Sequence, residues 1–314
     1  MRIIALLNRG GGTLRTTDLD ALEAHLREAM QAGGHTIDIR FIDGEAVGRE
    51  LEAAAGSPNH DAVLAGGGDG TISAAAAALM GSGKTLLVLP AGTMNLFARA
   101  LGLPMDLHKA VDALAGGVAR DVDIATADGR PFVHQFSVGL HARMVLMRSR
   151  FEYASRLGKM LASLRAAYAA LAKPSTIEAE LVMGETVVRA RTPGIGISNN
   201  LFGDGPLPIA EKPDGGLLGI YIFRTARRLE IALLFVAMML GRWKEIETVD
   251  IHQSEEVVLR VRSRRRNQTC VIDGELMPAS NETTLRIHPK ALQVMVPAGN
   301  DQSKKRTDGQ KRWT

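Results

Sequence analysis

One glycine-rich segment carries the clearest chemical signal in this sequence. It reads Gly66-Gly67-Gly68-Asp69-Gly70-Thr71 and separates a short apolar run from an alanine-rich stretch. Glycines let several backbone amides approach an oxyanion at once, and the helix expected after Thr71, its N-cap, would add a partial positive charge. Asp69 would repel phosphate unless a cation lay between them, so it indicates Mg²⁺ or a role in proton transfer. The segment predicts a phosphate site.

A second polar loop follows the next apolar run. Its residues are Pro90-Ala91-Gly92-Thr93-Met94-Asn95, in which Thr93 and Asn95 offer side-chain hydrogen bonds. If both apolar runs are strands of one parallel sheet, the two loops lie at its carboxyl edge, where ligands bind in such folds. We therefore expect this loop beside the glycine-rich segment.

A lysine between the two loops could be mistaken for a P-loop lysine. The segment Gly81-Ser82-Gly83-Lys84-Thr85 resembles the end of that motif, but the motif requires glycine at position 78, where this chain has Ala78. The segment also precedes an apolar run instead of opening a helix. We interpret it as a turn between a helix and a strand.

Two carboxylates near the C-terminus could act on a hydroxyl group. Asp273 and Glu275 are separated by one glycine at the end of an apolar run. Such a pair can position and deprotonate a hydroxyl. Asp-Gly is also a strong hairpin signal, and the residues alone favour a simple turn.

The composition is that of a protein with two packed domains. The chain has 314 residues, 46% hydrophobic and 4% aromatic, so it can bury a sizeable interior but offers few platforms for stacking bases. The single cysteine, Cys270, cannot build a disulfide framework or a cysteine-based metal site, which fits a reducing compartment. The N-terminus lacks a signal-peptide pattern. The longest apolar run, 231–240, is about half of the ~20 residues that cross a bilayer, so we expect a buried or interfacial helix.

The net charge of +4 is concentrated in two places, the arginine cluster between Arg260 and Arg266 and the C-terminal tail. Basic clusters attract anionic membranes or nucleic acid, and many are only solvated faces. The charge therefore leaves a membrane partner open. We expect no nucleic-acid partner, since no other feature of the sequence indicates one. Binding of DNA or RNA through the arginine cluster would have to be salt-sensitive.

Strand and helix patterns alternate over the first part of the chain. Short apolar runs predict strands, and apolar residues three or four positions apart predict helices. The alternation is typical of a doubly wound parallel sheet. The predicted strands are 2–7, 36–42, 61–65 and 85–89, and the predicted helices are 17–32, 47–55, 72–80 and 107–115.

After Asp123 the pattern changes to many short strands with turn signals between them, as in an antiparallel sandwich. The turn-like segment 128–131 predicts a boundary, which gives domains 1–127 and 128–298 and a disordered basic tail, 299–314. Helices are expected at 141–171 and 225–240, and the basic amphipathic part 151–171 suits a membrane surface as well as packing on the sandwich. The predicted strands are 132–138, 177–182, 186–191, 194–198, 218–223, 257–261, 269–272, 283–287 and 292–296.

At this point the sequence resembles a known family. The order Gly67-Gly68-Asp69-Gly70-Thr71, then 90–99, then Pro213-Asp214-Gly215-Gly216, then Ile272-Asp273-Gly274-Glu275 is similar to the diacylglycerol kinase catalytic domain. The resemblance is closer to the bacterial lipid kinases of the diacylglycerol and sphingosine kinase superfamily, and it extends from Asn8 to about Ala298. It implies an N-terminal α/β domain and a C-terminal β-sandwich, the architecture shared with NAD kinases.

The resemblance also implies roles for individual residues. Asn8, Gly66 to Thr71, Thr93 and Asn95 would hold the phosphates of ATP. Asp273 or Glu275 would take the proton of a lipid hydroxyl, with Asp69 as a further catalytic carboxylate. The Mg²⁺ site would consist of Asp214, the region of Glu211 and Gly216, and the linked acidic residue Asp123.

Two positions depart from the family pattern. Arg9 replaces the proline of the Asn-Pro start, and Leu96 stands where the family often has an aspartate. Leu96 removes one carboxylate from the expected metal-linked network, so it affects the metal assignment more than the nucleotide assignment.

These expectations lead to an ATP- and Mg²⁺-dependent kinase that phosphorylates a lipid hydroxyl. Diacylglycerol is the first substrate to test, and a sphingoid base, ceramide or phosphatidylglycerol remains open. The alternatives are an NAD kinase-like enzyme for a soluble metabolite and a nucleotide-binding lipid sensor without turnover. We expect a cytoplasmic protein without a transmembrane segment that meets its lipid substrate at the inner face of the membrane, and a homodimer remains open.

Overall fold

The computed structural model describes residues 1–149, 176–224, 227, 229–230, 233, 236–237, 241, 248–262 and 269–299. The chain forms two compact units. One contains Met1–Asp121 and the residues from Gln293 onward, and the other contains Val122–Leu292. The expected α/β domain and antiparallel β domain are both confirmed. Strands β5 (Val118–Ala127) and β16 (Glu282–Val296) continue from one unit into the other.

The first unit is built on a parallel sheet with the strand order β2-β1-β3-β4-β16. The central strands β1 and β3 are almost continuously apolar and buried, because both of their faces are covered. The edge strand β2 alternates between more and less exposed residues instead. The bounds are β1 Arg2–Asn8, β2 Thr36–Ile42, β3 Ala62–Gly67 and β4 Thr85–Pro90.

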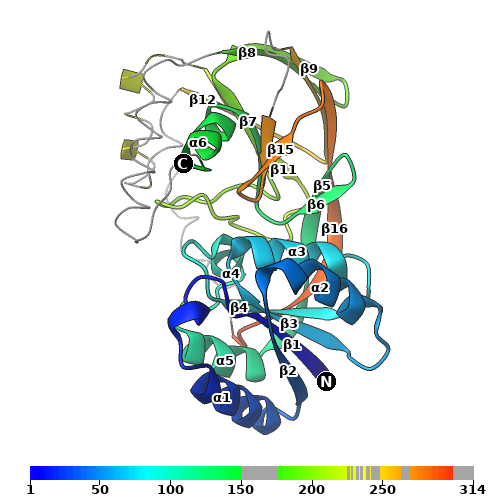
Figure 1. Cartoon of the computed structure of the whole chain (residues 1–314). Coiled ribbons are helices and arrows are strands. Elements are labelled where there is room, and N and C mark those ends of the chain that lie inside the picture. The colour runs from blue at the N-terminus through cyan, green and yellow to red at the C-terminus, as the bar shows by residue number, and fades with distance from the viewer. Residues whose placement is uncertain are drawn as a thin grey trace, which may run out of the picture. The chain divides into compact units, whose positions relative to one another are not determined.

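Helices cover both faces of this sheet, as expected for a doubly wound fold. The helices α1 (Leu19–Ala32) and α5 (Leu107–Ala115) pack together on one face, and α2 (Val47–Gly56) and α3 (Asp69–Leu79) pack together on the other (Figure 1). Asp18 and Asp106 cap α1 and α5 by accepting backbone N–H groups in the first turn. A short helix, α4 (Leu96–Ala100), follows β4.

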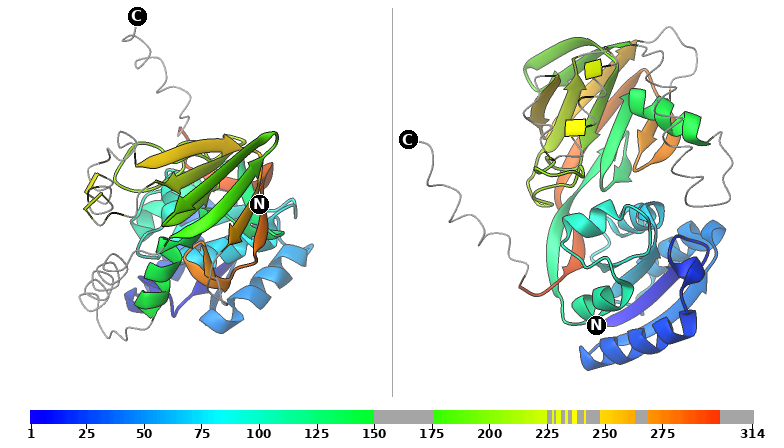
Figure 2. Two further views of the ribbon diagram at one scale, coloured as in Figure 1. Left: turned by 90° about the horizontal axis from the view of Figure 1, so that it is seen from above. Right: turned by 90° about the vertical axis from the view of Figure 1, so that its left-hand side faces the viewer.

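The second unit is a pair of facing antiparallel sheets (Figure 2). One sheet has the order β12-β11-β10-β7-β14-β15, and the other contains β9, β8, β13 and part of β16, with β5 and β6 attached. Their inner faces form one apolar core that includes Phe132, Phe136 and Leu259. The bounds are β6 Arg130–Phe132, β7 Gln135–Gly139, β8 Ile177–Met183, β9 Thr186–Thr192, β10 Gly194–Ser198, β11 Leu218–Phe223, β12 Val249–Ser254, β13 Glu256–Arg262, β14 Thr269–Ile272 and β15 Glu275–Pro278.

Three sequence-based expectations for these elements were wrong. The strands expected at 283–287 and 292–296 are one strand, β16, because Lys290 adopts a left-handed conformation (φ 55°) that bends the chain without ending it. The strand expected at 132–138 is interrupted between β6 and β7. The N-cap of α3 is Gly68 and not Thr71, so the helix includes Asp69.

Other predictions fall partly outside the described residues. Helix α6 (Leu140–Ser149) represents the start of the helix expected at 141–171, and residues 150–175 lie outside the description. The same holds for much of 225–240 and for 300–314. The turn expected at 128–131 is present, with left-handed Asp128 and Gly129 joining β5 to β6.

Candidate active site

Three loops meet at the carboxyl ends of β1, β3 and β4 in the first unit. Thr13 N donates to the carbonyl of Ala91 at 2.7 Å, which ties the loop after β1 to the loop after β4. A Cβ on Gly92 would lie 2.8 Å from the Cα of Gly68, so these two backbones are in direct contact. A Cβ on Gly12 would lie 1.9 Å from the Ala91 carbonyl oxygen. The prediction that the two polar loops are neighbours is therefore confirmed.

The glycine-rich segment places the N-terminus of α3 at this edge. The amides of Asp69, Gly70 and Thr71 occupy the first turn, where no carbonyl one turn earlier can accept from them. Gly70 is exposed and Gly68 is half-buried, so the amide groups lie close to solvent. A Cβ on Gly67 would collide with Thr71 at 2.6 Å, which requires glycine there. The site fits an anion, because free amides and a helix dipole converge on it.

Asn8 connects the first strand to this helix. Its Nδ2 donates to Thr71 Oγ1 at 3.2 Å, and its Oδ1 accepts from Gly10 N at 3.2 Å. Both polar ends of the Asn8 side chain are thus occupied by protein groups. The structure brings Asn8 and Thr71 together as the sequence suggested, and it gives Asn8 a role in shaping the loop.

Asp69 lies within the glycine-rich segment, but its carboxylate points to the loop after β4. Its two oxygens accept from Asn95 N at 3.0 Å and from Leu96 N at 2.7 Å. These amides begin α4, so Asp69 caps a helix that is not its own. Because both of its oxygens accept hydrogen bonds from these amides, the carboxylate has less need of a cation than the sequence alone indicated.

Asn95 closes the second loop on itself. Its Oδ1 accepts from Gly92 N at 2.7 Å and its Nδ2 donates to Gly92 O at 3.1 Å. The backbone of Asn95 is left-handed, with φ 50°, and the residue is buried. Thr93, in contrast, is exposed. Thr93 can therefore reach a ligand directly, whereas Asn95 holds the loop in shape.

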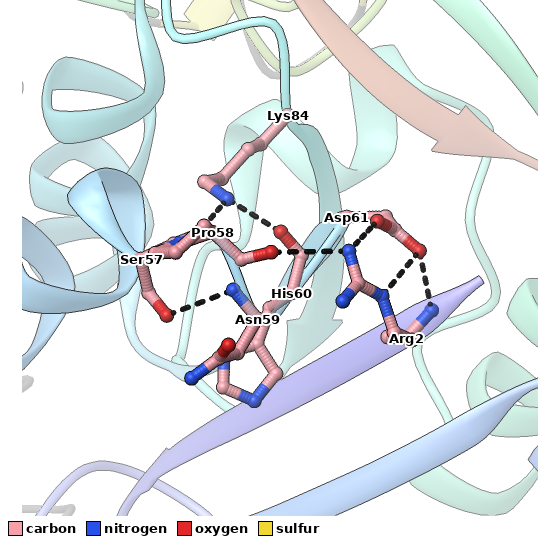
Figure 3. A network of polar contacts seen from close by, with 7 residues as sticks. All are labelled: Arg2, Ser57, Pro58, Asn59, His60, Asp61 and Lys84. Carbon is pink, nitrogen blue, oxygen red and sulfur yellow. Dashed lines mark hydrogen bonds and ion pairs between the residues drawn. The ribbon is translucent and has the colours of Figure 1, made fainter.

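Lys84 does not belong to a phosphate site. It follows the turn expected between α3 and β4, in which Gly81 and Gly83 both have positive φ. Its Nζ donates to the carbonyls of Ser57, the C-cap of α2, and His60, in the loop before β3 (Figure 3). Arg2 joins the same network by donating to Pro58 O and pairing with Asp61 at 2.7 Å, which holds the pKa of the Asp61 carboxyl well below its usual range. This cluster lies at the amino ends of the strands and stabilises the sheet.

In the second unit, Asp123 is a buried carboxylate with a structural role. It is 1% exposed, and its oxygens accept from Gly216 N at 2.7 Å and Lys290 N at 2.9 Å. Its own N–H donates to Pro213 O at 2.8 Å. Asp123 thus fastens the loop that contains Asp214 and Gly216 to β5, which brings these three expected residues together.

Sequence reasoning missed two asparagines beside this loop. Asn199 Nδ2 donates to the carbonyls of Asp123 and Val133 at 3.0 and 3.3 Å. The side-chain oxygen and nitrogen of Asn200 are buried without a hydrogen-bond partner, and its Oδ1 lies 2.9 Å from the position of a Cβ on Gly215. The sequence signal was the pair Asn199-Asn200 directly after an apolar strand. In the structure Asn200 has a positive φ, a conformation that asparagine tolerates.

The loop around Asp214 is the candidate for a Mg²⁺ site. Among the described residues, no group of three His, Cys, Asp or Glu side chains is arranged to hold a metal. The loop nevertheless offers oxygen donors, which Mg²⁺ prefers: the exposed carboxylate of Asp214, backbone carbonyls, and the unpartnered Asn200 Oδ1. The donor set fits Mg²⁺ in kind, with one carboxylate and otherwise neutral oxygens. Glu211 is exposed, and its N–H donates to Leu201 O at 3.0 Å.

Asp273 and Glu275 lie in the hairpin between β14 and β15. Asp273 and Gly274 are its turn residues, with φ 46° and 87°. The carboxylate of Asp273 accepts from three amides, those of Val133, His134 and Gln135, each at 2.9 Å. Asp273 therefore anchors the start of β7, and few of its lone pairs remain to take a proton.

Glu275 differs from Asp273 in its surroundings. Its side chain is 60% exposed and forms an ion pair with Arg130, whose guanidinium lies 3.5 Å away. The carboxylate is therefore open to solvent and accessible to a ligand. Of the two carboxylates, Glu275 is the one available for chemistry.

Known proteins resemble this chain over both units. Residues 2–127 match the model of the diacylglycerol kinase catalytic domain, and residues 137–296 match the YegS C-terminal NAD kinase β-sandwich-like domain. A protein of Pseudomonas syringae pv. tomato named "Probable lipid kinase YegS-like" is 31% identical over 306 residues, which cover 89% of this chain and 91% of that protein. The diacylglycerol kinase of Bacillus subtilis is 29% identical over 280 residues, covering 83% and 87%.

An uncharacterised protein of Synechocystis is 28% identical over 247 residues, and the match spans only 55% of that longer protein. The crystal structure of a diacylglycerol kinase from Bacillus anthracis has a TM-score of 0.67 at 15% identity and covers 95% of this chain and 97% of its own, which shows the fold. The chain belongs to the family of diacylglycerol kinases and YegS-like lipid kinases. None of the helices that the structure describes is long and apolar enough to span a bilayer.

Proposed function

We propose that this chain transfers the γ-phosphoryl group of ATP to the hydroxyl of a membrane lipid, with diacylglycerol as the first substrate to test. The observation that carries the proposal is the anion site at the N-terminus of α3, where the amides of Asp69, Gly70 and Thr71 face the exposed Thr93 loop. Family membership favours a lipid over a soluble acceptor.

The protein groups have separate tasks in this reaction. The amides of residues 68–71 and the hydroxyl of Thr93 bind phosphate oxygens, and Asn8, Asp69 and Asn95 hold these loops in shape. Asp214, with the backbone carbonyls of Glu211 and Gly216, would hold Mg²⁺, which supplies charge neutralisation for the phosphates when it is bound.

Glu275 is the proposed base. It takes the proton of the lipid hydroxyl as the oxygen bonds to the γ-phosphorus and the bond to the β-phosphate oxygen breaks, which leaves ADP and a lipid phosphate. Asp273 is proposed as a positioning residue, because its three amide bonds fix the turn from which Glu275 projects.

The test is a radiolabelled-ATP assay with separate acceptors: diacylglycerol, ceramide, a sphingoid base, phosphatidylglycerol and NAD⁺. We expect labelled lipid with the wild type and a kcat lowered by about a hundredfold or more in Glu275→Gln, because general bases contribute on this scale. Glu275→Gln should unfold like the wild type, whereas Asp273→Asn should unfold at lower urea concentration, since it loses acceptors for buried amides.

Two outcomes would overturn the proposal. Labelling of NAD⁺ but of no lipid would make the chain a soluble-metabolite kinase. ATP binding without labelling of any acceptor would make it a nucleotide-binding sensor. Full activity in Glu275→Gln would remove Glu275 from the role of base and leave the kinase assignment standing.

A further inference from the structure

One ion pair at the carboxyl edge of the first unit has no role in the proposed function so far. Arg9 directly follows β1, and Asp43 directly follows β2, the strand that runs parallel to β1. Arg9 N donates to Ile42 O at 3.1 Å, which keeps the two strand ends together. The order β2-β1-β3 puts the end of β2 two strand spacings, about 10 Å, from the end of β3 and its glycine-rich segment.

The two side chains pair through both carboxylate oxygens. Arg9 Nε donates to Asp43 Oδ1 at 2.7 Å, and Arg9 Nη2 donates to Asp43 Oδ2 at 2.8 Å. Two parallel bonds of this kind fix the plane of a guanidinium, which a single bond does not. The side chains are 54% and 66% exposed, and their chain neighbours Gly10 and Gly44 have no side chains to cover them. A flat cation is thus held in place and open to solvent.

Asp43 binds Arg9 in place of a more ordinary partner. It is the N-cap residue of a short 3₁₀ helix, Gly44–Ala46, where an aspartate side chain commonly accepts a backbone N–H of the first turn. Its side chain makes no such cap bond, and both of its oxygens accept from Arg9 instead. These bonds lower the pKa of the Asp43 carboxyl, so the pair stays charged at neutral pH. The carboxylate serves to fix the guanidinium.

The base of a bound nucleotide needs a surface at this edge. With the phosphates at the N-terminus of α3, the base extends along the edge toward β2 or toward β4. The loops 9–13, 43–46, 68–71 and 91–95 contain no aromatic residue for it to stack on. A guanidinium plane stacks on aromatic rings and adds a cation–π attraction. On the β4 side the exposed apolar residue is Met94, 43% exposed, whose flexible side chain would lose more freedom on binding than a fixed plane.

We propose that the guanidinium of Arg9, held by Asp43, is the platform on which the adenine of ATP stacks. Arg9 contacts the base, and Asp43 is a positioning residue that acts through Arg9. The inference rests on the proposed function, since it takes ATP as the ligand of the anion site. It gives a task to the arginine that stands where the resembling family has proline.

The test is titration calorimetry, in the presence of Mg²⁺, with ATP and with inorganic tripolyphosphate, which has the phosphates but no base. Arg9→Ser/Asp43→Asn removes one charge of each sign, so the net charge beside the phosphates is unchanged. This variant should raise the Kd for ATP about fivefold, the scale of a cation–π contact, and leave the Kd for tripolyphosphate unchanged. Arg9→Lys keeps the charge without the planar face, so it should also weaken ATP binding. Asp43→Asn alone should raise the ratio of the Kd for ATP to the Kd for tripolyphosphate, because the guanidinium is no longer fixed.

A second arginine–aspartate pair provides the matched control. Arg40 and Asp38 pair at 3.0 Å within β2, away from its carboxyl end, and their side chains are 50% and 51% exposed. Arg40→Ser/Asp38→Asn should leave the Kd for both ligands unchanged. Urea unfolding of both double variants should follow the wild-type curve closely, because exposed ion pairs contribute little to stability.

Three results would overturn the inference. Equal weakening of ATP and tripolyphosphate in Arg9→Ser/Asp43→Asn would show that Arg9 contacts a phosphate. Wild-type affinity for ATP in Arg9→Lys would show that the planar face is not used. A ratio changed by Met94→Ser, and not by Arg9→Ser/Asp43→Asn, would put the base on the β4 side.

Kinase assays separate this inference from the proposed function. A changed ratio in Arg9→Ser/Asp43→Asn, without phosphorylation of any acceptor by the wild type, would refute the kinase and leave the platform in place. Labelled lipid from the wild type, with an unchanged ratio in the variant, would refute the platform and leave the kinase in place.

Discussion

Substitutions at Asn95 distinguish two ways in which this residue holds the loop after β4 in shape, its side-chain hydrogen bonds and its left-handed backbone. Its side chain makes two hydrogen bonds to Gly92, at 2.7 and 3.1 Å, and its backbone is left-handed at φ 50°. Alanine would lose both bonds, each worth about 1 kcal/mol, and would add about 1 kcal/mol for a side chain in the left-handed region. Glycine would lose the same bonds without the backbone cost.

We therefore expect Asn95→Ala to lower the free energy of unfolding by about 3 kcal/mol and Asn95→Gly by about 2 kcal/mol. Urea unfolding followed by circular dichroism measures both values. Each variant should also raise the KM for ATP, because the loop that carries Thr93 is no longer closed at Gly92.

Thr93→Ala is the control for this series, since Thr93 is exposed in the same loop. It should leave the unfolding curve unchanged and raise the KM for ATP alone. Equal stability of the alanine and glycine variants would refute the argument from backbone conformation. Wild-type stability in both would refute the argument that the side-chain bonds close the loop.

Two further predictions concern residues outside the loops. Lys84→Met should lower the free energy of unfolding by about 1–3 kcal/mol, because the carbonyls of Ser57 and His60 lose their donor. It should leave the KM for ATP unchanged, and a raised KM would restore the P-loop interpretation. Burial lowers the pKa of His141, whose Nδ1 lies 2.6 Å from Ser137 Oγ, so the unfolded chain takes up a proton first as the pH falls below about 6.5, and stability falls with it. In urea titrations from pH 8 to pH 5, His141→Gln should lose less stability than wild type, and parallel losses would exclude His141 as a source.

The position of the glycine-rich loop at the carboxyl edge of the sheet could be predicted because its signals are local. A strand, a glycine cluster and a helix follow one another within the segment from Ala62 to Leu79, and their order determines which end of the sheet the loop occupies. The turn at Asp273 and Gly274 was equally visible, since Asp-Gly favours the left-handed pair of conformations that the hairpin needs.

The partners of the carboxylates could not be predicted in this way. Asp273 accepts from Val133, which lies 140 positions earlier, and Asp123 accepts from Lys290, which lies 167 positions later. Such contacts depend on how strands of the sandwich pair, and one sequence gives no register between distant strands. Judged from the neighbouring residues alone, a carboxylate in a glycine-containing turn suggests a catalytic role. In the structure its oxygens accept hydrogen bonds from backbone amides that are distant in the sequence.

Leu96 shows how the same contacts explain a departure from the family pattern. Asp69 is bound through the backbone N–H of residues 95 and 96, and a backbone donor is present whatever side chain follows. Replacing an aspartate by leucine at position 96 thus keeps the cap on α4 and removes a second negative charge from the neighbourhood of Asp69. Oxygen atoms that could serve a metal are grouped around Asp214 in the second unit, so the Mg²⁺ site proposed there does not depend on the residue at position 96.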